Sequence, residues 1–252
     1  MQQVQVDGVS VVLPLITDQT ALFLDFDGTL VEIAPQPELV QVPTDLVAIL
    51  SRLSGRIKGG LAIVSGRPMA QLDQFMAPLV LPVAAEHGAL QRLPGGREIR
   101  AAPVDLQEVG RVALGLTARH PELRVEIKSA SVALHYRQAP ELEMLCLDAM
   151  EEATKRTAGV ELLKGKCVFE VKLSGVSKAT AIQTFMAQAP FRGRVPVFAG
   201  DDTTDEVGFS AVQSMGGQGI KVGAGSSLAE LRCTSPAHLR QWLQSASPGA
   251  ST

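Results

Sequence analysis

Five short, predominantly apolar runs constrain the fold of this chain more than any other feature, because four of them end directly at polar residues. The runs lie at residues 21–24, 60–64, 81–85, 195–199 and 219–222. An apolar run of this length, bounded by turn residues, is typical of a strand buried on both faces. Segments with helical spacing separate the runs, as at residues 43–53 and 69–76. This alternation predicts right-handed crossovers and a parallel sheet with helices on both faces.

The middle of the chain has a different order of elements. Its spacing predicts helix, strand, strand and then again helix, strand, strand, at residues 106–118, 123–128, 132–137, 141–157, 160–164 and 167–172. An αββαββ order predicts an antiparallel sheet with helices on one face. We therefore expect an α/β fold with a Rossmann-like parallel-sheet core, formed by residues 1–102 and 174–252, and an inserted αββαββ domain at residues 103–173.

Composition narrows the classes of partner. The 252 residues are 46% hydrophobic and carry a formal net charge of −3, which argues against nucleic acid as the main partner. Nowhere do 18 apolar residues follow one another, so we expect no membrane span. The three cysteines form no CxxC pair, and the first 20 residues contain no Lys or Arg. These features predict reduced thiols and a cytoplasmic location.

Two acidic clusters follow predicted strands. Residues 25–29 read Asp-Phe-Asp-Gly-Thr, and residues 200–206 read Gly-Asp-Asp-Thr-Thr-Asp-Glu. Carboxylates crowded at the end of a buried strand repel one another unless a divalent cation binds them. With a metal, one carboxylate can attack phosphorus and another can exchange protons with the leaving oxygen. Acidic residues also cap helices, and each cluster taken alone leaves that alternative open.

Two cationic or hydroxyl features complete the set. Residues 65–68 read Ser-Gly-Arg-Pro and lie at a predicted helix start, where a hydroxyl and backbone N–H groups bind anions or simply cap the helix. Lys178 opens the predicted helix at residues 178–186, after the return from the inserted domain. A phosphoryl-transfer site rich in carboxylates needs such a fixed cation, although most lysines lie on the solvated surface.

Taken in order, these motifs resemble those of the haloacid-dehalogenase superfamily of phosphatases, and the insertion resembles the larger α/β cap of that superfamily. More closely, residues 21–222 resemble the trehalose-6-phosphate phosphatase family. The resemblance is carried by residues 24–30, 64–68, 85–89, 125–137, 170–178 and 200–209. The sequence departs from the family pattern at Ala179, where the family more often has Gly after the lysine.

The resemblance implies a role for each matching position. The catalytic positions fall on Asp25, Asp27, Thr29, Ser65 and Lys178. Asp25 is expected to be the nucleophile and Asp27 the general acid/base, while Thr29 orients the loop. Ser65 and Lys178 are expected to hold the phosphoryl oxygens. The implied cofactor is Mg²⁺, with metal positions at Asp25, Asp27 (through its carbonyl), Asp201, Asp202 and Asp205, the last two in or near the outer part of the site.

Alternation in the inserted domain suggests where a sugar binds. Its strands place charged residues of both signs and His135 on one face, which suits a polyhydroxylated ligand, although solvation explains a polar sheet face equally well. The resemblance points to sugar contacts at Lys128, His135, Arg137, Glu170 and Lys172, with Glu86 and His87 from the core. Gly66 and Arg67 are expected to bind the substrate as well. The expected partner is a small-molecule sugar phosphate, and a monomer is expected.

The expected reaction is hydrolysis of trehalose 6-phosphate through a phospho-aspartate. Related alternatives are a phosphatase for sucrose phosphate or a hexose phosphate, and a phosphomannomutase. A sugar-phosphate sensor without catalysis is an alternative of another class, but no candidate catalytic position is lost from the sequence.

Overall fold

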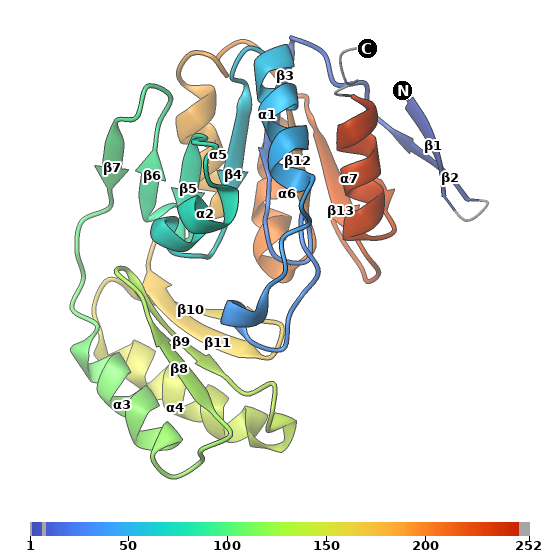
Figure 1. Ribbon diagram of the computed structural model, residues 1–252. Helices are drawn as coiled ribbons and strands as arrows, with labels where there is room; N and C mark the ends of the chain where they lie inside the picture. Colours follow the sequence, from blue (N-terminus) through green and yellow to red (C-terminus); the bar gives the residue numbers. More distant parts are fainter. Residues whose placement is uncertain (1, 7–8, 247–252) are drawn as a thin grey trace. The chain divides into compact units, whose positions relative to one another are not determined.

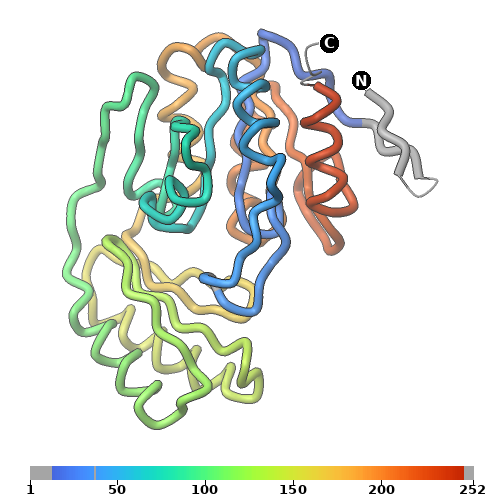
Figure 2. Tube along the Cα trace, in the orientation of Figure 1, coloured from blue at the N-terminus to red at the C-terminus, as the bar shows by residue number. Residues whose placement is uncertain are grey.

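The chain folds into two units, each with its own hydrophobic core. The structure is a computed structural model that describes residues 2–6 and 9–246. One unit comprises Met1–Ile99 and Ser177–Thr252, and the other comprises Arg100–Val176. In Figure 2 the colours show that the first unit is built from both ends of the chain and the second from its middle. We call them the core unit and the inserted unit. The predicted insertion covered residues 103–173.

An eight-stranded sheet forms the centre of the core unit (Figure 1). In spatial order its strands are β14 (Leu231–Cys233), β13 (Gln218–Val222), β12 (Val195–Gly200), β3 (Thr20–Leu24), β4 (Leu61–Val64), β5 (Val83–Ala85), β6 (Leu90–Arg92) and β7 (Glu98–Arg100). The neighbours from β14 to β5 pair in parallel, and β6 runs antiparallel to β5. The predicted α/β class and the five predicted parallel strands are confirmed.

Helices cover both faces of this sheet. They are α1 (Leu46–Arg56), α2 (Met69–Met76), α5 (Lys178–Met186), α6 (Glu206–Ser214) and α7 (Pro236–Ser245). Leu22 and Leu24 of β3 pack in one hydrophobic cluster together with residues of α1, α2 and α7. Their neighbour Phe23 packs on the opposite face in a second cluster with residues of α5 and α6. Because successive strand residues point to opposite faces, a strand covered on both sides must be apolar throughout.

Several elements differ from the expectation. A hairpin of β1 (Gln2–Val6) and β2 (Val9–Leu13) was not predicted, nor were β6, β7, β14 and α7. The helix predicted from residue 43 begins at Leu46, because Pro43 forms a turn in which its carbonyl accepts from the Leu46 N–H at 3.0 Å. The small and polar residues at 245–252 predict a frayed tail. In the structure α7 continues to Ser245, and residues 247–252 lie outside the described residues.

The inserted unit has the predicted αββαββ order. Its elements are α3 (Gln107–Thr117), β8 (Arg124–Ile127), β9 (Ser131–His135), α4 (Glu143–Arg156), β10 (Val160–Gly165) and β11 (Val168–Leu173). The four strands pair antiparallel in the order β10-β11-β9-β8. Val132 and Leu134 of β9 pack with apolar residues of α3 and α4 in one cluster. The helices therefore cover one face of this sheet and leave the other to polar residues.

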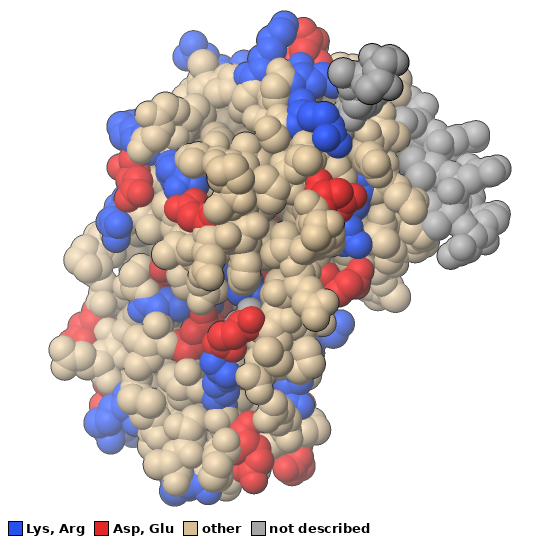
Figure 3. Space-filling view, in the orientation of Figure 1, with Lys and Arg blue, Asp and Glu red and all other residues tan. Residues whose placement is uncertain are grey.

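Some chemical properties of the chain follow from these units. No helix within residues 2–6 and 9–246 is both long enough and apolar enough to cross a bilayer. Cys146, Cys167 and Cys233 are free thiols. On the face drawn in Figure 3, acidic and basic side chains are interspersed.

Candidate active site

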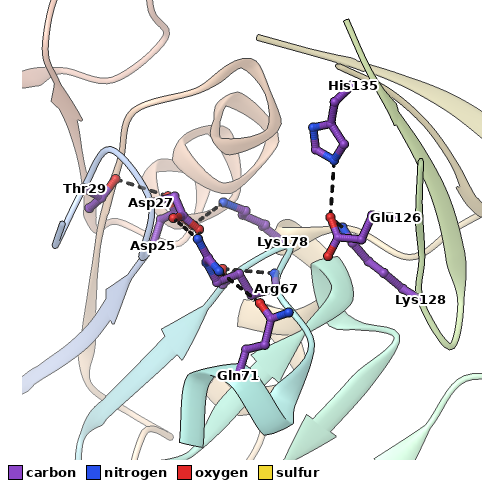
Figure 4. Close-up of polar contacts among 10 residues, drawn as sticks. Asp25, Asp27, Thr29, Arg67, Gln71, Glu126, Lys128, His135 and Lys178 are labelled. Carbon is purple, nitrogen blue, oxygen red and sulfur yellow. Dashed lines mark hydrogen bonds and ion pairs between the residues drawn. The ribbon is translucent and has the colours of Figure 1, made fainter. Parts of the chain in front are cut away.

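Asp25 is held in a fixed orientation at the carboxyl end of β3. Its side chain is buried, and its backbone N–H donates to the carbonyl of Ala199 on β12. One carboxylate oxygen accepts from Lys178 Nζ at 2.7 Å, and the other accepts from the Thr29 hydroxyl at 3.2 Å (Figure 4). Thr29 is itself completely buried. These contacts aim one carboxylate at a defined position, as a nucleophile requires.

Lys178 reaches this site from the first turn of α5. Ser177 caps that helix by accepting from the Thr180 N–H, which fixes the backbone from which the lysine extends. The ammonium is 3% exposed and donates to Asp25 and, at 2.6 Å, to Asp205. Burial disfavours its charged form, but the two carboxylates outweigh this and raise the pKa of Lys178 above its usual value. Lys178 therefore stays a cation.

Asp205 organises the loop after β12. Its carboxylate accepts from the backbone N–H groups of Asp201 and Asp202, both at 2.9 Å. Gly200 allows this close packing, since a Cβ there would lie 2.3 Å from the Asp205 Cγ. Asp202 caps the next turn, because its carboxylate accepts from the Thr203 N–H at 2.8 Å.

Three carboxylates converge beside the nucleophile. Oxygen atoms of Asp25, Asp201 and Asp205 all lie within 4.8 Å of one another. Burial raises the pKa of Asp25, and burial with the charge of Asp205 raises the pKa of Asp201 to about 7. Such a set of hard oxygen donors fits Mg²⁺, because a divalent cation offsets the repulsion that burial intensifies. Asp202 is not part of this cluster.

Gly28 allows the acidic loop at residues 200–206 to pack closely against the loop at residues 25–29. It has φ +72°, and a Cβ at this position would lie 2.2 Å from a carboxylate oxygen of Asp201. Glycine is therefore needed both for the left-handed backbone and for the approach of Asp201 to the first loop.

The loop after β4 carries Ser65, which is 1% exposed. The Ser65 hydroxyl accepts from the Arg67 N–H at 3.2 Å. Its backbone N–H donates to Ala84 of β5, which places the hydroxyl at the carboxyl end of the sheet. This is the same end at which Asp25 and the loop after β12 lie, because all these strands are parallel.

Glu86 and His87 follow β5 in an unusual backbone conformation. Their φ angles are +48° and +59°, a region that costs a residue with a side chain about 1 kcal/mol or more. Their N–H groups donate to the carbonyls of Arg67 and Ser65, which hold the turn against the loop after β4. A Cβ on Gly66 would lie 2.6 Å from the His87 Nε2, so the imidazole packs directly over Gly66.

Lys221 is a site residue that the sequence analysis missed. It is 5% exposed on β13, and its ammonium donates to the backbone carbonyl of Asp201. Its charge favours the ionised form of that aspartate. A lysine inside the predicted buried strand at residues 219–222 was a signal that it has a buried partner.

In the inserted unit, a polar cluster lies on the sheet face opposite the helices. Lys128 donates to Glu170 at 3.0 Å, and the Ser131 hydroxyl donates to the same carboxylate. His135 lies 3.3 Å from the second acid, Glu126 (Figure 4). Burial raises the pKa of Glu126, but the hydrogen bond with His135 and the charge of Lys128 outweigh burial and hold this pKa below its usual value. Ser131 and Glu126 were not among the predicted sugar contacts.

Two further predicted sugar contacts have other hydrogen-bond partners. Lys172 donates to Glu161 on β10 and to the backbone carbonyl of Val176. Arg137, just beyond β9, is exposed and donates to the Lys166 carbonyl at 3.0 Å.

Comparison with known proteins gives a consistent result. A family model described as "Trehalose-phosphatase" matches residues 23–236. Trehalose-6-phosphate phosphatase of Escherichia coli (strain K12) is 38% identical over 233 residues, which are 92% of this chain and 88% of that protein. A protein of Sinorhizobium fredii named "Probable trehalose-phosphate phosphatase" is 40% identical over 209 residues, covering 82% of this chain and 78% of its own.

A solved structure agrees with these relatives. The crystal structure of a trehalose-6-phosphate phosphatase related protein matches with a TM-score of 0.70 at 28% identity, covering 88% of this chain and 94% of the other. Fold, motifs and relatives lead to one conclusion. The chain belongs to the trehalose-phosphatase family.

Proposed function

We propose that this protein hydrolyses trehalose 6-phosphate to trehalose and phosphate with the help of Mg²⁺. The observation that carries the proposal is the buried carboxylate of Asp25, oriented by Lys178 and Thr29 beside two further aspartates. Membership of the trehalose-phosphatase family supports the substrate. Free thiols agree with a cytoplasmic location, and we expect a monomer that needs no nucleic acid or membrane.

In the first step, an Asp25 oxygen attacks phosphorus and the bond from phosphorus to the sugar oxygen breaks. Asp27, protonated at this stage, gives its proton to that oxygen, and trehalose leaves. In the second step, the Asp27 carboxylate takes a proton from water as the water oxygen attacks the aspartyl phosphate. The bond to Asp25 breaks, phosphate leaves, and both aspartates regain their starting forms. Lys178 and Ser65 hold the phosphoryl oxygens throughout.

Asp25, Asp201 and Asp205 are the residues that would hold Mg²⁺, with the Asp27 carbonyl as a further oxygen. When bound, the cation supplies positive charge that stabilises the charge on the phosphoryl group. Asp205 also accepts from Lys178 and two backbone N–H groups, so its main task is to shape the site. Lys221 fixes the backbone of Asp201.

The sugar is proposed to bind the polar cluster of the inserted unit. Lys128, Glu170 and His135 offer donors and acceptors that match hydroxyl groups. A site built from such groups rejects a ligand that leaves them unpaired. Within the core unit, Glu86 and His87 are proposed contacts, and their strained backbone supports this because such strain concentrates at functional sites.

A panel of phosphorylated sugars tests the proposal. Phosphate release is measured with trehalose 6-phosphate, sucrose phosphate and hexose phosphates, each with Mg²⁺ and with a chelator. We expect preference for trehalose 6-phosphate and loss of activity with the chelator. Equal rates on all sugars would refute the proposed specificity, and transfer of phosphate to a second sugar position would indicate a mutase. Binding without turnover would indicate a sensor.

A further inference from the structure

Arg67 makes a two-pronged ion pair with Asp27. Its Nε donates to one Asp27 oxygen at 2.6 Å, and a terminal nitrogen donates to the other oxygen at 2.7 Å. The arginine side chain is 8% exposed, whereas the aspartate side chain is 36% exposed. Since burial alone does not restrain the aspartate, its orientation depends on the arginine.

Other contacts fix Arg67 independently of Asp27. The guanidinium carbon lies 5.1 Å from the ring centre of Phe75 and 5.9 Å from that of Phe26. These two rings are nearly parallel, with centroids 5.6 Å apart. A further guanidinium nitrogen donates to Gln71 Oε1 at 3.0 Å, one helical turn along the chain (Figure 4). The Arg67 guanidinium is therefore held in place with two donor nitrogens directed at Asp27, a geometry that a lysine ammonium does not reproduce.

We propose that Arg67 is a positioning residue for the proposed acid/base Asp27. Arg67 was expected from the sequence to contact the substrate directly. Each carboxylate oxygen has two lone pairs, and the guanidinium engages one on each. The outward side of the carboxyl group stays available to the leaving oxygen or to water. This inference rests on the proposed function, because it assigns Arg67 to the proton-transfer part of that reaction.

The dependence on the leaving group separates this role from a structural one. A sugar oxygen leaves poorly without a proton, whereas p-nitrophenolate leaves readily and needs little help. For Arg67→Gln we expect kcat on trehalose 6-phosphate to fall about 10- to 100-fold, part of the usual contribution of general acid catalysis. KM on trehalose 6-phosphate should stay within about twofold. On p-nitrophenyl phosphate, kcat/KM reports only the steps up to departure of the phenolate and should change much less, whereas kcat on both substrates also includes the second step, in which Asp27 acts as base. Arg67→Lys should not restore the loss.

The chain offers a matched control in Arg92. This arginine makes a comparable two-pronged pair with Asp73, at 2.7 and 2.9 Å, within the core unit, and its side chain is 12% exposed. Arg92→Gln removes an equivalent ion pair without touching Asp27. We expect it to alter thermal stability but to leave the ratio of the two substrate activities unchanged.

Three results would overturn the inference. One is an equal loss of kcat/KM on both substrates in Arg67→Gln, and another is an effect on trehalose 6-phosphate that lies mainly in KM, as a sugar contact gives. The third is additivity of Arg67→Gln with Asp27→Asn, since residues acting in one step lose little more together than singly. If Arg67→Gln does not fold, Gln71→Ala serves instead, because it removes a contact that fixes the Arg67 side chain. It must then give the same difference between the two substrates, with a smaller loss of activity.

The proposed function fails in a different way. If the wild-type protein cleaves other alkyl phosphates but not trehalose 6-phosphate, the substrate proposal falls, and the comparison for Arg67 is made on the alkyl phosphate that is cleaved. A wild-type protein without any phosphatase activity would overturn both.

Discussion

The core site and the polar cluster of the inserted unit each place one lysine between two acids, but they differ in the group that stands beside these three. In the core, Lys178 lies between Asp25 and Asp205, and Asp201 stands close to both acids. In the inserted unit, Lys128 lies between two glutamates, and one of these also contacts His135. The core acids come from loops at strand ends and Lys178 from the first turn of α5, whereas the cluster residues lie on or beside neighbouring strands of one sheet face.

This difference indicates that the two units have different roles. Burial, together with the crowded acids of the core, raises the pKa of Asp25 and Asp201, so this site needs a cation and a reacting group to be complete. The inserted unit lowers the pKa of Glu126 by pairing it, which makes a surface of nearly balanced charge. The first arrangement suits chemistry at phosphorus, and the second suits recognition of a neutral sugar by hydrogen bonds.

Removal of the proposed nucleophile from the core site should have the largest effect on activity. We expect Asp25→Asn to lower kcat by on the order of 10⁴-fold or more, as loss of a nucleophile does elsewhere. The fold should persist, because the change also removes one of several repelling buried charges. Phosphate release and thermal melting measure the two effects. A variant that keeps normal turnover would exclude the phospho-aspartate route.

Removal of the central cation of the core should affect stability and activity together. Lys178→Met leaves Asp25 and Asp205 buried without their shared partner. Breaking a buried pair in this way costs about 3–5 kcal/mol. Urea unfolding of the metal-free protein measures the loss. If the free energy of unfolding changes by less than about 1 kcal/mol, the network is not as tightly coupled as its geometry indicates.

An equivalent change in the inserted unit should act on binding instead. Glu170→Gln weakens the contacts with Lys128 and Ser131 and removes a charged acceptor from the proposed sugar site. A hydrogen bond to a charged group contributes about 1.5–3 kcal/mol, so kcat/KM for trehalose 6-phosphate should fall roughly 10- to 100-fold, mainly through KM. The rate on p-nitrophenyl phosphate serves as internal control. Equal losses on both substrates would contradict a role in sugar recognition.

The charge imbalance of the core predicts a pH-dependent response to Mg²⁺. In the metal-free protein the pKa of Asp201 is about 7, against a usual value of 3.8. The folded state therefore holds an extra proton between these values, and this contribution to stability is lost as pH rises through about 7. Since the cation binds the ionised carboxylate, stabilisation by Mg²⁺ should grow over the same range, reaching about 2.7 kcal/mol at 100 times Kd.

Melting curves with and without Mg²⁺ at pH 5.5 and pH 8 measure this response. The shift in melting temperature should be larger at pH 8, and Asp201→Asn should reduce the difference between the two pH values, with the raised pKa of Asp25 accounting for the remainder. An equal shift at both, or a larger one at the lower pH, would argue against binding at these carboxylates.

The smallest effect on activity and stability is expected on the helix-covered face of the inserted unit's sheet, opposite the polar cluster. Lys164 of β10 pairs with Glu151 of α4 at 3.0 Å, and both side chains are exposed. Lys164→Ala should change the free energy of unfolding by less than about 1 kcal/mol and leave KM unchanged. A clear rise in KM would mean that sugar recognition is not confined to the polar cluster.

The local hydrophobic pattern of the sequence was sufficient to predict most of the helices and strands. The runs at residues 21–24 and 195–199 became adjacent parallel strands, because uniform burial leaves an apolar run few alternatives. The helix at residues 69–76 was predicted with its observed bounds. By contrast, β6, β7 and β14 have only three residues each, too few for a periodic signal. The three-residue turn at Glu86 was also hidden, because its left-handed φ angles occur in residues that are not glycine.

The sequence by itself determined which chemical groups stand at the ends of the buried strands, since hydrophobic period and chain order are local properties. Only the tertiary structure decided how those groups pair. It directed Arg67 to Asp27, paired Lys221 with the Asp201 carbonyl, and gave the Asp202 carboxylate a capping hydrogen bond from the Thr203 N–H. The physical reason is that a hydrogen-bond partner depends on strand order and side-chain rotamer. Residues 40 positions apart, such as Arg67 and Asp27, meet only when the sheet has formed.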